Sequence, residues 1–370
     1  MLLYKESECR DGLCAIYDTD DNSLELLSPA YVAECIKAGI TIKDLPREGE
    51  LYDLLNPKNK NLTRAKKEKN DEFYTQLTDI EKELSHYDPE IFRDKVIYCP
   101  TDVATDQGKI LQSQFVHYFQ LKKDDLKFKK LIATCLAEKG EEFNNKYILV
   151  RKLSPYADPS SPYYNPSLTE DDDRYWSWGE STSECKADSN YGSGDFRSEE
   201  CLQLFDEANI VITNPPFSLF KDFFNLLLEK KKKFLILGSI NEVNFENVFY
   251  AFKNNKCWRG VTIHNGHTKF LVPEGYSTPG ERSKVTSDGR KYVEVGVRWY
   301  TNLDNSVRHE KYIPFKTWEN DKDTYKKYDG TDILHIEKST EVPIDYKGVM
   351  GVPVTFLDRL NPTQFEIVGF

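Results

Sequence analysis

The stretch NIVITNPPF, residues 209–217, decides the fold. Ile210–Thr213 is a short apolar and β-branched run, which is typical of a buried strand. It ends in Asn214 and two prolines, which cannot continue a strand ladder. An amphipathic run, LFKDFFNLLLEKKK (219–232), and a second apolar run, KKFLILGS (232–239), follow directly. This strand–turn–helix–strand order predicts a βαβ unit with parallel strands.

The same alternation extends upstream. Further strands and helices are expected at KVIYCP (95–100), QSQFVHYFQL (112–121), KKLIATCL (129–136), NKYILVRKL (145–153) and SEECLQLFDEA (198–208). The Pro-, Ser-, Asp- and Tyr-rich segment 155–194 is predicted to be a loop. After about residue 255 short strands dominate. We therefore predict an α/β fold with a Rossmann-like sheet, helices on both faces, and a strand-rich C-terminal region.

Composition narrows the class of protein. The 370 residues are 39% hydrophobic and 13% aromatic, enough for a sizeable core, and no run approaches the ~18 apolar residues of a membrane span. The N-terminus lacks a signal-peptide pattern. Eight cysteines without a CxxC pair fit a reducing cytoplasm, and the six histidines have no zinc or triad spacing. We expect a cytoplasmic protein without a metal site.

The net charge of −11 is concentrated in two windows, residues 1–60 and 151–200, and the remaining residues are neutral as a group. Global acidity therefore does not exclude a basic surface elsewhere. We divide the chain into an N-terminal accessory segment (1–60), a central domain (61–254) and a C-terminal region (255–370) that would complete the fold.

The tetrapeptide 214–217 carries the sharpest chemical signal. In an open α/β sheet, ligands bind beyond the carboxyl ends of strands. Pro215 and Pro216 make a rigid loop without N–H donors, so the Asn214 side-chain oxygen and nearby carbonyls are available as acceptors. Acceptors beside the ring of Phe217 suit the exocyclic amine of a planar base. An ordinary strand-to-turn Asn-Pro-Pro remains the alternative for this motif alone.

This motif resembles the (Asn/Asp)-Pro-Pro-(Tyr/Phe) signature of adenine-N6-specific DNA methyltransferases, and more narrowly the chain is similar to the EcoRI modification-methylase family. The blocks that carry the resemblance are KNDEFYTQ (69–76), VIYCPTD (96–102), GDFRSEEC (194–201), NPPFSLF (214–220), WYTNLD (299–304) and GVMGVP (348–353).

The resemblance implies an enzyme that uses S-adenosylmethionine and flips the target adenine out of the duplex. Asn214, Pro215, Pro216 and Phe217 would form the catalytic site. The cofactor would be held by Phe73, Tyr74, Thr75, Cys99, Pro100, Asp102, Thr134, Asp195, Phe196 and Asn214.

Two features depart from the general methyltransferase pattern. No Gly-x-Gly loop follows the first strand, and no acid ends the strand LIATC (131–135) to bind the ribose hydroxyls. Either Thr134 contributes one hydroxyl there or another group holds the ribose. Asp195 would accept from the cofactor's adenine amine while Phe196 packs on its ring.

The family resemblance also implies double-stranded DNA as substrate, a monomeric enzyme, and a restriction endonuclease that acts on the same site without a stable complex. It makes residues 61–254 the S-adenosylmethionine-binding catalytic domain and residues 255–370 the DNA target-recognition region. Candidate groove contacts in that region are Trp258, Arg259, His264, His267 and Lys269. Two other classes stay open: an RNA adenine or protein glutamine N-methyltransferase using the same tetrapeptide, and a DNA-binding relative without catalysis.

Overall fold

The computed structural model describes residues 2–4, 14–18, 24–27, 75–101, 113–137, 144–263, 268–271, 284–285 and 291–369. The chain divides into two compact units, Met1–Asn70 and Asp71–Phe370. In the first unit, three short antiparallel strands form a sheet: β1 (Leu2–Tyr4), β2 (Cys14–Asp18) and β3 (Leu24–Leu27).

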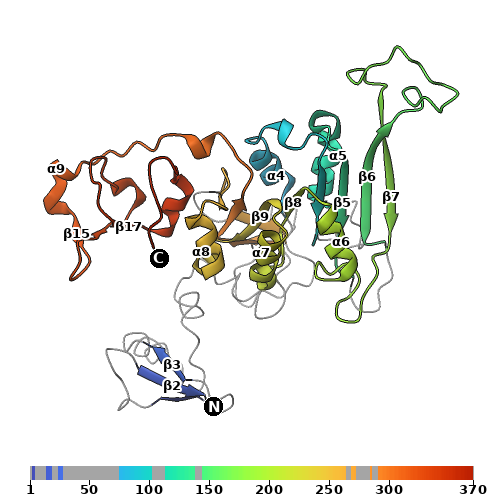
Figure 1. Ribbon diagram of the computed structural model, residues 1–370. Coiled ribbons are helices and arrows are strands. Elements are labelled where there is room, and N and C mark those ends of the chain that lie inside the picture. The colour runs from blue at the N-terminus through green and yellow to red at the C-terminus, as the bar shows by residue number, and fades with distance from the viewer. Residues whose placement is uncertain are drawn as a thin grey trace. The chain divides into compact units, whose positions relative to one another are not determined.

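The second unit is built on an eight-stranded sheet with the order β10-β14-β9-β8-β4-β5-β6-β7 (Figure 1). Its strands are β4 (Val96–Cys99), β5 (Lys130–Thr134), β6 (Lys146–Leu153), β7 (Trp176–Ser183), β8 (Ile210–Thr213), β9 (Lys233–Ser239), β10 (Trp258–Arg259) and β14 (Val297–Thr301). The four central strands β9, β8, β4 and β5 are parallel, whereas β6, β7 and β14 pair antiparallel with their neighbours. The predicted α/β fold is confirmed.

Helices cover both faces of this sheet, as two successive residues of β14 show. Tyr300 contacts the ring of Phe220 on one face, with ring centroids 5.2 Å apart, and Trp299 contacts Phe115 on the other, at 6.5 Å. Successive strand residues point to opposite faces. The helices of the second unit are α4 (Leu77–Leu84), α5 (Gln114–Leu126), α6 (Glu199–Glu207), α7 (Phe220–Glu229), α8 (Glu246–Lys253) and the short α9 (Trp318–Asp321).

The main core lies between the sheet and helices α6, α7 and α8. It is formed by large buried side chains including Tyr98, Phe205, Phe223, Phe224, Phe234, Phe252 and Tyr300. Burial of aromatic groups on this scale is the principal source of stability of such a layer. It also holds the strand ends beside the site rigid.

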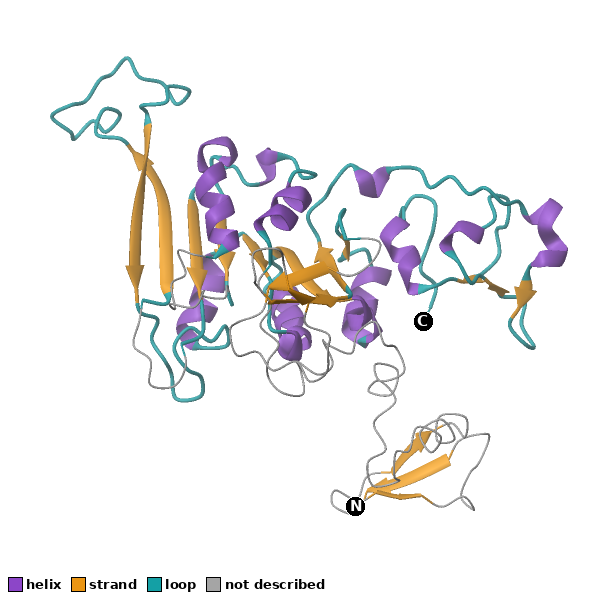
Figure 2. Cartoon of the chain, turned by 180° about the vertical axis from the view of Figure 1, so that it is seen from behind, coloured by secondary structure: helices purple, strands orange, loops and turns teal. Residues whose placement is uncertain are grey.

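The segment expected to be a loop contains strand β7. It pairs with β6 over eight residues, from Lys146–Ser183 to Leu153–Trp176, and the two form a long hairpin at the edge of the sheet (Figures 1 and 2). The sequence WSWGESTS has no apolar alternation that would predict a strand. Its tryptophans supply the contacts instead: the Trp178 ring lies 4.9 Å from Phe128, and the Arg151 guanidinium lies 4.4 Å from the Trp176 ring.

The C-terminal region contains several short strands, and two of them, β10 and β14, belong to the central sheet. Two further three-stranded sheets are formed by β11 (Thr268–Leu271), β12 (Lys284–Val285) and β13 (Lys291–Val295), and by β15 (Lys326–Lys327), β16 (Leu334–His335) and β17 (Met350–Gly351). The latter packs on its own apolar cluster of Leu334, Ile336, Val342 and Phe356. No helix within the described ranges is both long and apolar enough to cross a bilayer.

Candidate active site

The order of the central strands places the tetrapeptide at a switch point of the sheet. The chain passes from β4 to β5 on one side, and later adds β8 on the other side of β4. Because β4, β5 and β8 are parallel, their carboxyl ends meet at the same edge. Ligands of open α/β sheets bind in the crevice at such a point. The geometry thus brings Pro100 and Asn214 to adjacent strand ends.

A direct hydrogen bond joins these two strand ends. The hydroxyl of Thr213 donates to the carbonyl oxygen of Pro100, and its oxygen lies 3.2 Å from Oγ1 of Thr101. Thr101 has φ of +56°, a left-handed conformation that is unusual for a β-branched residue. It stands where related sheets carry a flexible Gly-rich turn. Backbone strain of this kind concentrates at functional sites.

Within the tetrapeptide, the side chains are packed against the protein. Asn214 is 8% exposed and Phe217 is 1% exposed. Pro216 precedes a single 3-10 turn, η6 (Phe217–Leu219), which leads into α7, and its carbonyl accepts from the N–H of Leu219. The tight turn therefore holds the tetrapeptide at a fixed place beyond β8. A base could stack on the Phe217 ring only after the side chains around that ring move.

Asp195 and Phe196 follow Gly194, which packs against the carboxyl end of β5. The Asp195 carboxylate accepts from Nε of Arg197 at 3.0 Å, from Nη2 at 2.8 Å and from the Arg197 N–H at 2.9 Å. The side-chain hydrogen bonding between Arg197 and Asp195 raises the pKa of the Arg197 guanidinium. Phe196 is buried edge-to-face against Phe223, with centroids 5.0 Å apart. A carboxylate accepts about four hydrogen bonds, so Asp195 keeps capacity for one more.

Thr134 ends β5 but does not face the site. Its hydroxyl lies 2.8 Å from the Tyr98 hydroxyl, and both side chains are fully buried. Burial raises the pKa of Tyr98 well above its ordinary value, so the phenol remains a neutral partner. Thr134 therefore has no exposed hydroxyl for a ribose in this conformation. Of the two alternatives for the ribose, this placement favours another group.

The structure describes only some of the other residues that are predicted to bind the cofactor. Cys99 is the last residue of β4 and is fully buried. Thr75 is 5% exposed just before α4, and its buried hydroxyl has no hydrogen-bond partner among the described residues. Phe73, Tyr74 and Asp102 lie outside the described residues.

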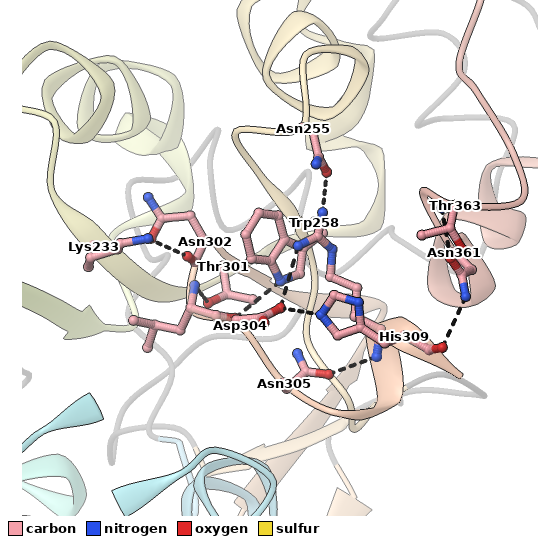
Figure 3. Close-up of polar contacts among 12 residues, drawn as sticks. Lys233, Asn255, Trp258, Thr301, Asn302, Asp304, Asn305, His309, Asn361 and Thr363 are labelled. Atoms are coloured by element: carbon pink, nitrogen blue, oxygen red, sulfur yellow. Dashed lines mark hydrogen bonds and ion pairs between the residues drawn. The ribbon is translucent and has the colours of Figure 1, made fainter. Parts of the chain in front are cut away.

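Of the expected DNA contacts, Arg259 is buried inside the fold and Trp258 is half-buried. The Arg259 guanidinium lies 4.2 Å from the Tyr300 ring, donates to Ile240 O at 3.0 Å and is 5% exposed. Trp258 donates from Nε1 to Leu303 O at 3.2 Å, and the Arg308 guanidinium lies 3.5 Å from its ring (Figure 3). The buried Arg259 offers no surface to a DNA groove in this conformation, whereas the half-buried Trp258 stays a candidate contact. Sequence pattern could not reveal these environments, because the partners of both residues are remote in the chain.

Of the three remaining candidate DNA contacts, the structure describes only the backbone of Lys269. Lys269 lies in β11, where its backbone pairs with Glu294 of β13. His264 and His267 fall outside the described residues. Within the described ranges, no group of three or more His, Cys, Asp or Glu side chains could hold a metal ion.

Several residues that shape the site were not singled out by the sequence. Three of them, Thr101, Thr213 and Arg197, are direct sequence neighbours of predicted site residues. They could have been found by including the residues that flank each predicted position. Asn145 and Glu83 act across 40 and 178 residues of chain, respectively. No local pattern signals such contacts.

Comparison with known proteins identifies the family of the chain. A profile described as adenine-specific methyltransferase EcoRI matches residues 61–370. The chain is 39% identical over 322 residues to Type II methyltransferase M.EcoRI of Escherichia coli, covering 85% of this chain and 90% of that protein. It is 35% identical to M.MgeORF184P of Mycoplasma genitalium and 33% identical to M.MpnI of Mycoplasma pneumoniae. Each of those two matches spans 312 residues, 82% of this chain and 84% of the relative. No solved structure matches the chain significantly.

Proposed function

Because the chain belongs to the adenine-specific methyltransferase EcoRI family, and is thus a DNA methyltransferase, we propose that it transfers a methyl group from S-adenosylmethionine to N6 of adenine at a specific duplex site. The observation that carries the proposal is the joining of two strand ends by Thr213 and Pro100. It brings the tetrapeptide 214–217 next to the turn after β4, where a donor and an acceptor substrate could meet.

The target adenine must leave the duplex, since its N6 is inaccessible within the stack. The Asn214 side-chain oxygen and the Pro215 carbonyl would accept hydrogen bonds from the two N6 hydrogens. These bonds draw the nitrogen lone pair out of conjugation with the ring. The alkylated nitrogen loses its proton readily, so the chain needs no strong base. Positioning and electrostatics supply the catalysis.

The residues present fit S-adenosylmethionine, which would supply an electrophilic methyl group on a sulfonium. The buried Thr75 hydroxyl, without a partner in the described part of the chain, suits the polar methionine moiety. Asp195 has one acceptor position left for an adenine amine. Pro100 would line the pocket between these two. Phe73, Tyr74, Asp102 and the Cys99 backbone complete the proposed cofactor set.

DNA recognition is assigned to residues 255–370, with His264, His267 and Lys269 as proposed contacts. The half-buried Trp258 stays a further proposed contact, and the buried Arg259 would act through the residues packed on it. We propose a monomer that acts in the cytoplasm, with any partner endonuclease reading the same site separately. Binding would weaken with salt, with a slope of log K against log salt of about −0.9 per phosphate neutralised.

The proposal is tested with the full chain and cofactor carrying a tritiated methyl group, offered duplex DNA, RNA and protein in separate reactions. We expect label in duplex DNA alone, released as N6-methyladenine on digestion. Label in RNA adenine or in protein glutamine would replace the proposal with the corresponding alternative. Binding to DNA without transfer to any of the three would identify a catalytically silent relative.

A further inference from the structure

Asn145 lies just before β6, is fully buried, and uses its whole side-chain amide. Its Nδ2 donates to Cys135 O at 3.0 Å and to Ser193 Oγ at 2.8 Å, and its Oδ1 accepts from the Cys185 N–H at 2.7 Å. Its backbone carbonyl accepts from the Cys135 N–H at 3.1 Å. One side chain thus ties the carboxyl end of β5 to two points of the segment that precedes α6.

The segment tied down in this way leads directly into Asp195. Gly194 has φ of +76°, and a Cβ there would lie 1.9 Å from Cys135 O and 2.6 Å from Asn145 Nδ2. Only glycine allows so close an approach of backbone to backbone. Ser193 adds two bonds, accepting from the Ala137 N–H at 3.0 Å and donating from Oγ to Cys185 O at 2.7 Å. The position of Asp195 relative to β5 is therefore set one residue before it.

We propose that Asn145 is a positioning residue for the cofactor's adenine: through Ser193 and Gly194 it sets where the Asp195 carboxylate stands to accept from the exocyclic amine. This rests on the function proposed above. Arg197 holds the carboxylate from the other side through two side-chain bonds. The carboxylate then has a defined direction for its remaining acceptor position, and a hydrogen bond weakens steeply as its geometry departs from the optimum.

The role of Asn145 has a signature that a merely structural role lacks. If Asn145 acts through Asp195, its loss should weaken the binding only of ligands that carry an amine at position 6 of the purine. S-adenosylhomocysteine has this amine, whereas S-inosylhomocysteine carries a carbonyl oxygen in its place. The ratio of the two affinities therefore reports the placement of Asp195, and a general loosening of the pocket would lower both affinities alike.

The test is titration calorimetry of the full chain with each of these two ligands. We expect the unaltered protein to prefer the adenosyl ligand by about tenfold or more, the ~1.4 kcal/mol that one directed hydrogen bond can supply. In Asn145→Ala the ratio should fall below about threefold, with the inosyl affinity changed by less than about twofold. Asn144→Ala is the matched control, because Asn144 is exposed and makes one 3.3 Å bond to Thr182; its ratio should not change.

If Asn145→Ala does not fold, Ser193→Ala tests the positioning role instead. It removes one of the two acceptors of Asn145 Nδ2, so it should also lower the ratio of the adenosyl to the inosyl affinity. The positioning role is overturned if a folded variant keeps the affinity ratio of the unaltered protein, or if its affinity for both ligands falls equally. Either result leaves the proposed function intact. Failure of the unaltered protein to bind either ligand overturns the proposed function itself, and the role of Asn145 with it.

Discussion

The hydroxyl of Thr213, the last residue of β8, donates a hydrogen bond to the carbonyl oxygen of Pro100, the first residue beyond β4. Thr213 is fully buried, so water cannot replace this bond. The bond links the turn on the proposed cofactor side to the residue before Asn214. The two halves of the site are therefore held to one another directly.

Replacing Thr213 by valine, which keeps the shape of the side chain and removes the hydroxyl, tests this link. We expect a loss of about 1–3 kcal/mol in the free energy of unfolding, because the Pro100 carbonyl loses its buried donor. Methyl transfer should slow as well, since Asn214 is no longer fixed relative to the turn at Thr101. Urea denaturation and single-turnover kinetics measure the two effects. Thr213→Ser keeps the hydroxyl and should retain most of the stability and most of the transfer rate. Equal losses in the serine and valine variants would contradict the role of the hydrogen bond.

Glu83 supports the start of the proposed DNA-reading region from α4. Its buried carboxylate accepts from the N–H groups of Val261 and Thr262 at 2.8 and 2.7 Å, from the Thr262 hydroxyl at 2.5 Å and from the Tyr87 hydroxyl at 2.8 Å. Each carboxylate oxygen accepts two of these bonds, so Glu83→Gln would turn an NH2 group toward two donors. We expect it to lower the free energy of unfolding by about 1.5–3 kcal/mol, measured by urea denaturation. Glu81→Gln, on a half-buried position of the same helix, is the control. A Glu83→Gln protein as stable as the control would show that these bonds contribute little.

Asp358 joins the C-terminal region to the central sheet. It lies in the 3-10 segment η11 (Val354–Arg359), where its carboxylate pairs with Arg298 at 3.0 Å and with Arg259 at 3.8 Å. All three side chains are at most 6% exposed. Asp358→Asn leaves two buried cations poorly compensated, so we expect a loss of about 3–5 kcal/mol in unfolding free energy.

The matched control for Asp358 is Asp332→Asn, which removes an ion pair with Lys327 at an aspartate side chain that is 97% exposed. Thermal unfolding should not distinguish that variant from the unaltered protein, because exposed pairs contribute little. A Tm for Asp358→Asn that equals the control would contradict the buried cluster as the link between the two regions.

The N-terminal residues offer a test of domain organisation. The family profile begins at residue 61, and the first compact unit ends at Asn70. We propose that residues 1–60 are an accessory segment, and a chain that starts at Asn61 should then fold, bind cofactor with unchanged affinity and methylate the same sites. Light scattering, calorimetry and mapping of the methylated sites check these points. Aggregation or loss of cofactor binding would assign residues 1–60 to the core of the catalytic unit.

Local sequence was sufficient for features encoded by short periodic runs. The apolar runs at β4, β5, β8 and β9 predicted buried strands of a mostly parallel sheet, and the prolines after Thr213 marked the end of a strand, where we propose the active site. The α/β fold followed from the alternation of these runs with helices, and the family followed from motif blocks such as NPPFSLF (214–220). Strand β7 escaped prediction because tertiary contacts of Trp176 and Trp178, not an apolar alternation, stabilise it.

Side-chain environment was harder to predict than backbone. From the sequence, Thr134 is a candidate ribose contact and Arg259 a candidate groove contact, but their partners Tyr98 and Tyr300 come from neighbouring strands, and both side chains are buried. Asn145 carried no signal, since its partners lie at positions 135, 185 and 193. Residues that act over long separations in the chain become visible only when the sheet has assembled.

The most direct test of the account is the amount of N6-methyladenine that the Asn214→Ala protein forms in duplex DNA, compared with the unaltered protein at equal cofactor saturation. The account predicts that transfer is abolished while cofactor affinity stays within about tenfold, because Asn214 orients the target amine and other groups supply most of the cofactor binding. Methylation by Asn214→Ala at a rate near that of the unaltered protein would contradict the assignment of the active site to the carboxyl end of β8.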